Sequence, residues 1–398
     1  MTSPVPIRVL LVEDSPVALA VIQKTLKAAP GIEVVGTAKT GKAALTLIPE
    51  LTPQVICTDF HMPHMDGLAL TQAVMENYPT PILVLSVSVQ TQNTERIFQL
   101  LEAGAVDILA KPISGLKAAD TALNQALINK IRVLAGVKVF KKKAVLAHHT
   151  AQAATHQSIS VPQQPPHTQP SAPTQAAALG AAASTPSSSS GAHLTKPKII
   201  GIGASTGGPQ ALRILLSQLP KDCPPVICVQ HISVGFLPGL VKWLRQDCAA
   251  DISIAQAGDR PVPGRIYFSP NECHLTLNAR GQFALLDTGP VDGHRPSITV
   301  TFESLAQYYG KRAVGVLLTG MGQDGAAGLS QIRQAGGMTI AQDEATSVVF
   351  GMPQVAIARG AATQVLSIEA IAPKLHQLVH PPAAMPSHVT AESWEAPS

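Results

Sequence analysis

The feature that most limits how this chain can fold is a change in composition near its middle. Between about Ala144 and Lys196 the residues are mainly Ala, Gln, Ser, Thr, Pro and His, without periodic apolar positions. Ordering such a segment would cost backbone entropy that no buried surface offsets. We therefore expect two folded domains joined by a long disordered linker, and 398 residues are enough for two domains that each bury a core.

The predicted boundaries follow this change in composition. Residues 1–137 form the first domain, 138–196 the linker rich in Pro, Ala, Ser and Gln, 197–380 the second domain, and 381–398 a disordered tail. The linker also contains five histidines. Four of them are either solvated or weak metal ligands without fixed geometry, namely His148, His149, His156 and His167, and the fifth is His193.

Charge, cysteine content and hydropathy exclude several classes of protein. The formal net charge is only +4 and the C-terminal part has no helix-turn-helix pattern, which argues against nucleic acid as a partner. The 5 cysteines are odd in number and lack C-x-x-C spacing, which argues against a disulfide framework and a zinc site. We find no signal peptide and no apolar run near the ~20 residues that cross a bilayer. The sequence therefore predicts a cytoplasmic protein without direct membrane insertion.

Strands and helices alternate along the first domain. The apolar runs IRVLLV, EVVGTA, VICTDF, PILVLSV and AVDILAK are separated by helical patterns, the first of which covers Pro16 to Ala29. This alternation predicts an α/β fold with a five-stranded parallel sheet covered on both faces. Ligand chemistry in such folds lies at the carboxyl ends of the strands.

Charged residues follow three of these predicted strands. Glu13 and Asp14 come after the first, Asp59 after the third and Lys111 after the last. Carboxylates gathered at one edge repel each other unless a hard cation such as Mg²⁺ is bound, and a nearby lysine pairs with phosphate. An acid after a strand also caps the next helix, and for Asp14 that alternative stays open.

The motifs that contain these residues resemble a known family. "LVEDSP", "TDFHMPHMDGL", "LSVS" and "AGAVDILAKP" are similar, in order and spacing, to the receiver domain of two-component response regulators. The resemblance implies a flavodoxin-like fold and a histidine kinase as phosphodonor. It also implies that Asp59 is the phosphoacceptor, that Glu13, Asp14 and Asp59 hold Mg²⁺, and that Ser86 and Lys111 contact the phosphoryl group.

The second domain begins with the glycine-rich stretch GIGASTGGPQ at residues 201–210. A dinucleotide fingerprint would need a third glycine where Thr206 stands, and the lysine of a P-loop is missing. The stretch instead fits G-x-S-x-G, with Ser205 in a tight turn between a strand and a helix that begins near Pro209. A turn of small residues without catalytic function is the alternative.

A serine nucleophile needs a base and a group that orients the base. His231 follows the predicted strand VICVQ, and Asp324 follows the predicted strand AVGVLLTG. Taken alone, His231 is also compatible with packing and Asp324 with capping a helix. In a doubly wound, mostly parallel α/β sheet, however, such strand ends share one edge, so Ser205, His231 and Asp324 can converge. The chain order Ser, His, Asp differs from that of α/β-hydrolases.

With these residues, the second domain resembles the catalytic domain of the CheB family of chemotaxis protein-glutamate methylesterases. The matching stretches are IGIGASTGGPQAL, VQHI, GHRPSITVTFESLA, LLTGMGQDGAAGL and AQDEATSVVFGMPQVAI. The resemblance implies that Ser205 is the nucleophile, His231 the general base and Asp324 its orienting group. It places the amide of Met321 at the oxyanion and Thr206 in support of His231.

The resemblance also implies the substrate and the control of the enzyme. The substrate is the methylated chemoreceptor, which releases methanol, with deamidation of receptor glutamines as a second activity and no cofactor for the esterase reaction. An unphosphorylated receiver that blocks the catalytic edge, and phosphorylation of Asp59 that opens it, would regulate the reaction. The rival interpretation is a response regulator whose second domain binds a partner or DNA without catalysis.

Two further motifs have open interpretations. In GHRPS, His294 and Arg295 either contact an acidic substrate surface or form the entry to a helix that begins near Ser297. Met352 and Pro353 either line the site or end a strand.

Overall fold

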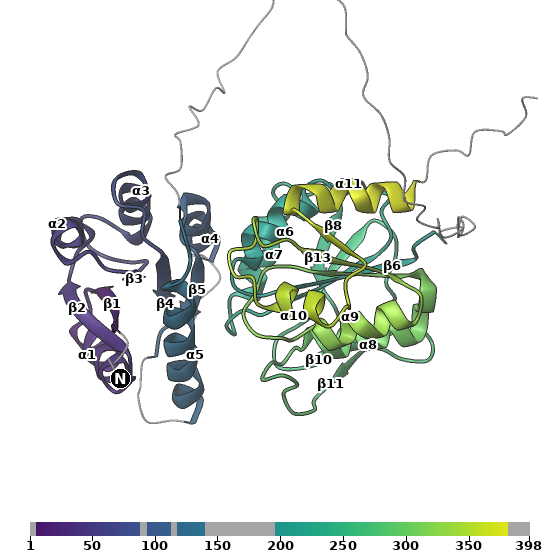
Figure 1. Cartoon of the computed structure of the whole chain (residues 1–398), viewed down its shortest axis with the longest axis horizontal. Helices are drawn as coiled ribbons and strands as arrows, with labels where there is room; N and C mark the ends of the chain where they lie inside the picture. The colour runs from purple at the N-terminus through teal and green to yellow at the C-terminus, as the bar shows by residue number, and fades with distance from the viewer. Residues whose placement is uncertain (1–4, 88–93, 113–117, 140–195, 381–398) are drawn as a thin grey trace, which may run out of the picture. The chain divides into compact units, whose positions relative to one another are not determined.

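The computed structural model describes residues 5–87, 94–112, 118–139 and 196–380, and the structural statements below concern these residues (Figure 1). Nearly all of the predicted linker, including its five histidines, and the predicted tail lie outside them. The domain boundaries and the disorder of these two segments therefore stay predictions. No helix in the described part of the chain is long and apolar enough to cross a membrane.

The N-terminal domain is built on a five-stranded sheet in the order β2-β1-β3-β4-β5, and every pairing is parallel. This confirms the predicted α/β fold of the first domain. The strands are β1 Ile7–Val12, β2 Ile32–Ala38, β3 Val55–Asp59, β4 Ile82–Ser86 and β5 Asp107–Ala110. The helices are α1 Pro16–Lys27, α2 Gly41–Leu51, α3 Gly67–Asn77, α4 Thr94–Ala103 and α5 Ala118–Leu134.

Local sequence explains where these elements begin. Every residue of the strands β3 and β4 is buried, and their polar residues lie only at the carboxyl ends, as expected for central parallel strands covered on both faces. Helices α1, α2 and α3 each start at a residue whose side chain accepts a hydrogen bond from the third amide after it: Ser15, Thr40 and Asp66. Since Ser15 caps α1, Asp14 is not needed for that task.

The C-terminal domain is a doubly wound α/β fold around a seven-stranded sheet in the order β14-β13-β12-β6-β7-β9-β8. All of its pairings are parallel, and an antiparallel hairpin, β10–β11, accompanies it. Its strands are β6 Ile199–Ala204, β7 Val226–Gln230, β8 Asp251–Ile254, β9 Arg265–Phe268, β10 His274–Leu277, β11 Phe283–Leu286, β12 Ala313–Leu317, β13 Met338–Gln342 and β14 Gln364–Leu366.

Two groups of helices cover the sheet of this domain. Helices α6, α7 and α11 lie on one face, and α8, α9 and α10 lie on the other (Figure 1). Their bounds are α6 Gly208–Leu216, α7 Leu237–Leu244, α8 Ile298–Tyr309, α9 Ala326–Gln334, α10 Met352–Ala358 and α11 Ile368–Val379, with a short 3₁₀ turn at Gly310–Arg312. The predicted doubly wound fold is therefore confirmed.

The strand order reverses at β6, which lies between β12 and β7. Ligand sites of doubly wound sheets lie at such a reversal, outside the carboxyl ends of the strands. Two glycines of β6 allow α8 to pack closely there, because a Cβ at Gly203 would lie 2.3 Å from Ile298 and one at Gly201 would lie 2.7 Å from Leu305. The first turn of α8 is thus brought to the edge where the predicted catalytic residues lie.

Candidate active site

Ser205 lies in the turn between β6 and α6, as the G-x-S-x-G pattern predicts. Its amide donates a hydrogen bond to the carbonyl of Thr319, 3.0 Å away, in the loop after β12. Gly207 follows with a φ of 75°, and a Cβ at that position would lie 2.5 Å from Val348. Glycine is needed here both for the left-handed backbone and for the close approach. The turn that presents Ser205 is therefore fixed at both ends.

A buried glutamine ties Ser205 to His231. Gln230, the last residue of β7, donates from Nε2 to the carbonyl of Ser205 at 2.8 Å and to the carbonyl of His231 at 2.9 Å. The amide of His231 donates in turn to the carbonyl of Ala204 at 3.0 Å. The backbones that carry the serine and the histidine are thus held side by side, and we did not identify Gln230 from the sequence.

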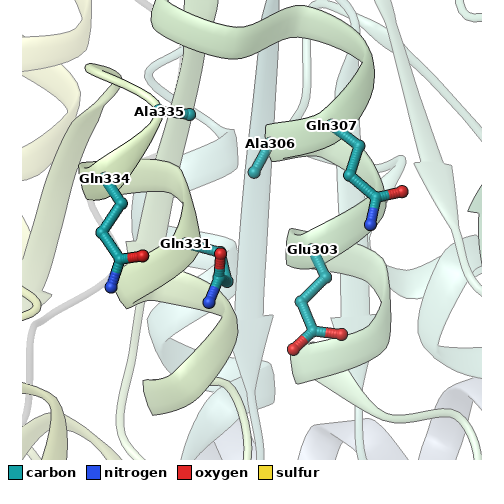
Figure 2. Close-up of a pocket in the computed structure, with 6 residues that line it drawn as sticks. All are labelled: Glu303, Ala306, Gln307, Gln331, Gln334 and Ala335. Atoms are coloured by element: carbon teal, nitrogen blue, oxygen red, sulfur yellow. The ribbon is translucent and has the colours of Figure 1, made fainter.

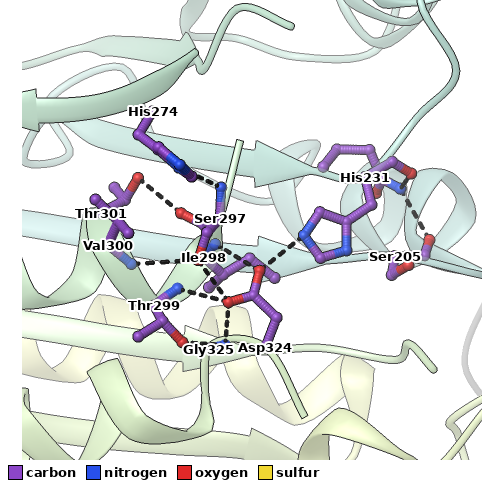
Figure 3. Close-up of polar contacts among 11 residues, drawn as sticks. Ser205, His231, His274, Ser297, Ile298, Thr299, Val300, Thr301, Asp324 and Gly325 are labelled. Atoms are coloured by element: carbon purple, nitrogen blue, oxygen red, sulfur yellow. Dashed lines mark hydrogen bonds and ion pairs between the residues drawn. The ribbon is translucent and has the colours of Figure 1, made fainter. Parts of the chain in front are cut away.

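His231 contacts Asp324 through its imidazole. Nε2 of His231 lies 2.9 Å from Oδ2 of Asp324, and both side chains are buried. Nδ1 of His231 is also buried, and it has no hydrogen-bond partner among the described residues. Figure 3 shows Ser205 on the side of the ring opposite Asp324. When Nε2 carries the proton and donates to the carboxylate, Nδ1 keeps a free lone pair, as a general base requires.

The carboxylate of Asp324 is surrounded by donors at the start of α8 (Figure 3). Besides His231, a hydroxyl and three backbone amides donate to it at 2.7 to 3.0 Å: those of Ser297, Ile298, Thr299 and Gly325. Burial acts to raise the pKa of Asp324, but the hydrogen bonds and the charge of the imidazole outweigh it and hold the pKa well below its usual range. Asp324 therefore contacts the imidazole of His231 and accepts from the first two amides of α8, whereas α9, the helix that follows Asp324 in the chain, has no side-chain cap.

A second histidine fixes the start of α8. His274 is fully buried, with Nε2 3.0 Å from the carbonyl of Gly289 and Nδ1 accepting from the amide of Ser297 at 3.1 Å. These contacts orient Ser297, whose hydroxyl donates to Asp324. A chain of hydrogen bonds thus runs from His274 through Ser297 and Asp324 to His231.

The loop after β12 carries Met321, which is partly exposed. The carbonyl of Gly320 accepts the amides of Gly351 and Met352, so this loop is anchored to the start of α10. Met352 begins a helix instead of ending a strand, and its side chain is fully buried. Thr206 is buried, and its carbonyl accepts from Thr319 Oγ1 at 3.0 Å. No hydrogen bond joins Thr206 to His231 in the described part of the chain, so its supporting role stays a prediction.

The N-terminal domain gathers its charged residues at the carboxyl edge of its own sheet. Lys111 Nζ lies 2.5 Å from Asp59 Oδ2 and 2.8 Å from Glu13 Oε2. Oxygens of Glu13, Asp14 and Asp59 lie within 4.8 Å of one another, and carboxylate oxygens are the ligands that Mg²⁺ prefers. Burial raises the pKa of Glu13, and Lys111 offsets this only in part. Ser86 ends β4, where its carbonyl accepts the amide of Lys111 at 2.8 Å. The residue types and their arrangement fit a magnesium site.

A separate groove of about 510 Å³ lies between α8 and α9 (Figure 2). It is lined by Glu303, Ala306, Gln307, Gln331, Gln334 and Ala335. Burial raises the pKa of Glu303, and the charge of Asp292 adds to this effect. None of the six lining residues belongs to the Ser205 site, and the groove contains neither a nucleophile nor a basic side chain among them. We assign the chemistry to the edge of the sheet instead.

Comparisons with known proteins match two families along the chain. The family model described as CheB methylesterase matches residues 200–375, and the response regulator receiver domain model matches residues 9–121. A protein-glutamate methylesterase/protein-glutamine glutaminase of Nitrosospira multiformis is 37% identical over 375 residues, which cover 94% of this chain and 97% of that relative. A protein of the same name from Anaeromyxobacter dehalogenans is 40% identical over 376 residues, which cover 94% of this chain and 97% of that relative.

A solved structure matches the C-terminal domain. The crystal structure of the Thermotoga maritima CheB methylesterase catalytic domain is 37% identical and matches with a TM-score of 0.45. The match covers 46% of this chain and all of that one.

Proposed function

The chain belongs to the CheB methylesterase family, and from this premise we propose that it hydrolyses glutamate methyl esters on chemoreceptors and releases methanol. The names of its relatives pair this activity with that of a protein-glutamine glutaminase. We therefore include deamidation of receptor glutamines as a second activity at the same site. The enzyme acts in the cytoplasm, in adaptation of a chemotaxis-type pathway.

The contact between His231 and Asp324, beside Ser205, is the observation that carries this proposal. Nδ1 of His231 takes the proton of the Ser205 hydroxyl, and the oxygen attacks the γ-carbonyl of the methylated glutamate. The imidazolium that forms is stabilised by Asp324, which stays ionised because its pKa is lowered. Proton transfer by a positioned base typically contributes 10²–10⁴ in rate.

The attack gives a tetrahedral intermediate, and the reaction is completed in two stages, acylation of Ser205 and hydrolysis of the resulting ester. His231 returns the proton to the methoxy oxygen, methanol leaves, and the glutamyl group stays bound to Ser205 as an ester. Water, deprotonated by His231, attacks this ester and releases the glutamate carboxylate and the serine. With a glutamine substrate the same steps release ammonia. Neither stage needs a cofactor.

The negative charge that develops on the carbonyl oxygen of the substrate needs a hydrogen-bond donor. The amide of Ser205 is already bonded to Thr319, so it is not the donor. The anchored loop after β12 presents the amide of Met321 at the same edge of the sheet, and we assign the oxyanion contact to it. One such donor is typically worth roughly 10²–10³ in rate.

The receiver domain supplies control. Asp59 is the phosphoacceptor, a histidine kinase is the donor, and Glu13, Asp14 and Asp59 would hold Mg²⁺. When bound, the ion balances negative charge on the phosphoryl oxygens. Lys111 pairs with the phosphoryl group, and the hydroxyl of Ser86 reorients toward it. Phosphorylation shifts the chain toward a state whose catalytic edge admits the receptor, which requires a different affinity for the two states.

Release of radiolabelled methanol from methyl-labelled receptors in membrane vesicles tests the esterase proposal. The full chain, supplied with Mg²⁺ and a small acyl-phosphate donor, should release methanol, and Ser205→Ala should release essentially none. Ser217→Ala, the same change in the first residue after α6, should behave like the wild type because its hydroxyl bonds only to the local carbonyl of Ile214. Equal release by Ser205→Ala and the wild type would overturn the proposal. Mass spectrometry of the same receptors tests the conversion of glutamine to glutamate.

A further inference from the structure

A second imidazole lies flat against the base. The rings of His231 and His294 have centroids 3.7 Å apart and planes only 5° from parallel. No hydrogen bond joins the two side chains among the described residues, so the contact between them is one of ring faces. His294 is half-buried in the loop that leads into α8.

The backbone places His294 firmly. Val291 and His294 exchange two hydrogen bonds across a two-residue turn, at 3.1 and 3.0 Å. The central residues of this turn, Asp292 and Gly293, have φ angles of 51° and 80°. Positive φ at both positions is typical of a type I′ turn, for which Asp-Gly is a favoured sequence. The carboxylate of Asp292 also accepts from the side chain of Gln323 at 2.9 Å, next to Asp324 in the chain.

The neighbouring arginine bonds to residues just before the turn. Arg295 pairs with Asp287 at 2.7 Å and donates to the carbonyl of Thr288 at 3.3 Å. Hydrogen bonds within the loop therefore hold the backbone of His294 and the side chain of Arg295. Of the two interpretations of GHRPS, the structure favours the helix-entry loop, and the loop has the added effect of presenting His294 to the base.

The charge of His294 suits this position. Burial lowers the pKa of His294 to about 4, and the charge of His231 adds to this effect. His294 is therefore neutral at physiological pH, even when its neighbour takes up a proton. A neutral aromatic face attracts a cation placed on it, whereas a second cation would repel it.

We propose that His294 is a positioning residue for the general base: its ring holds His231 in the plane set by Asp324 and stabilises the positive charge that His231 gains when Ser205 loses its proton. The imidazolium appears only after the proton moves, so the cation–π contact favours the transition state over the ground state. His294 touches neither the substrate nor Ser205 in this account. The inference rests on the proposed role of His231 as base.

The test compares four full-length proteins: wild type, His294→Phe, His294→Gln and His294→Ala. Phenylalanine keeps an aromatic face without hydrogen-bonding groups, whereas glutamine keeps polarity and similar size without the face. We expect kcat to fall roughly 2- to 30-fold in the Gln and Ala variants, with KM unchanged and near wild-type kcat in the Phe variant. Near wild-type kcat in the Gln variant with a loss in the Phe variant would assign His294 a hydrogen-bonding role and overturn the proposal. So would a change in KM alone, or wild-type kcat in the Ala variant.

A second readout separates this inference from the proposed substrate. The rate at which a fluorophosphonate labels Ser205 depends on activation of the serine and not on the receptor. Labelling should be slower in the Gln and Ala variants by the same factor as kcat, and absent in Ser205→Ala. If no protein releases methanol but labelling follows this order, the substrate assignment fails and the role of His294 stands. If labelling is equal in all four proteins, or also occurs in Ser205→Ala, the role of His294 fails.

Discussion

Both sheets end in a buried carboxylate at the carboxyl edge, but the two carboxylates are partnered in different ways. In the part of the receiver domain that the structure describes, Asp59 has the ammonium of Lys111 2.5 Å from one oxygen and a single amide, that of Phe60, 2.6 Å from the other. Asp324 of the catalytic domain has no lysine or arginine beside it among the described residues, but it accepts from a hydroxyl, three amides and an imidazole.

The difference matches what each group is expected to do. A carboxylate that must form a bond to phosphorus keeps an oxygen next to a mobile cation, which can move with the phosphoryl group. A carboxylate that must only stay charged is surrounded by fixed donors, and preorganised donors need no rearrangement during the reaction. The helix start of α8 supplies two of these amides and a favourable dipole. In the account proposed here, the same residue type, near the carboxyl edge of two α/β sheets, would support two kinds of chemistry.

The largest effect is expected when Asp324 loses its charge. Asp324→Asn keeps the shape of the side chain, but an NH₂ group replaces one oxygen and cannot accept from the donors on that side. The neutral side chain also does not stabilise the imidazolium. We expect kcat/KM for methanol release to fall by about 10³–10⁴ at saturating phosphodonor. A fall of less than tenfold would contradict the difference drawn between the two carboxylates.

The matched change in the receiver domain is Asp59→Asn. It removes the phosphoacceptor but leaves the catalytic edge chemically intact. Methanol release should therefore no longer respond to an acyl-phosphate donor with Mg²⁺, whereas wild type should be stimulated. If Asp59→Asn were stimulated as strongly as wild type, phosphorylation would have to act elsewhere.

A smaller effect is expected at Ser297, which donates to Asp324 and caps α8. Ser297→Ala should lower the free energy of unfolding by about 1–2 kcal/mol, the usual cost of losing such a cap, and lower kcat roughly tenfold. Ser367→Ala provides the control, since Ser367 stands at the start of α11 without a side-chain capping bond. Equal losses in the two variants would mean that the contact with Asp324 contributes nothing.

The last expected effect leaves the activity at neutral pH unchanged and is seen only in the pH dependence of stability. The unfolded chain protonates His294 near pH 6.5, while the folded chain does so only near pH 4. Between these values the unfolded state binds more protons, so the stability of the folded domain falls as the pH is lowered. At about 1.36 kcal/mol per pKa unit, the full difference is on the order of 3 kcal/mol. Hydrogen exchange of the β6 amides should show this fall in wild type and a smaller one in His294→Phe, and identical slopes would contradict the neutral state of His294.

The sequence could predict those residues of the site that follow directly after a strand. Ser205, His231 and Asp324 were placed together because each follows an apolar run, and the structure indeed puts β12, β6 and β7 side by side. The partners of Asp324 could not be predicted in this way. They come from α8, which reaches the edge only because two glycines of β6 let it pack closely.

The contacts of two other residues of the site could not be predicted from the sequence either. Gln230 looks like an ordinary strand residue, and only its burial between two carbonyls reveals its role. The motif GHRPS draws attention to His294, but the contact of His294 with His231 depends on the turn at Asp292 and Gly293. This turn places the ring of His294 against the ring of His231. Tertiary packing, not local pattern, decides both positions. Among the described residues, the capping residues of α1, α2 and α3 show the opposite case, where local sequence is enough.

The central claim is that one imidazole links the serine hydroxyl to a permanently charged carboxylate, and a crystal structure of the full-length protein measures this directly. The account predicts Oγ of Ser205 within hydrogen-bonding reach of Nδ1 of His231, at about 2.6–3.5 Å, while Nε2 remains bonded to Asp324. A structure in which Nδ1 bonds to another group and no rotamer of Ser205 reaches it would contradict the account.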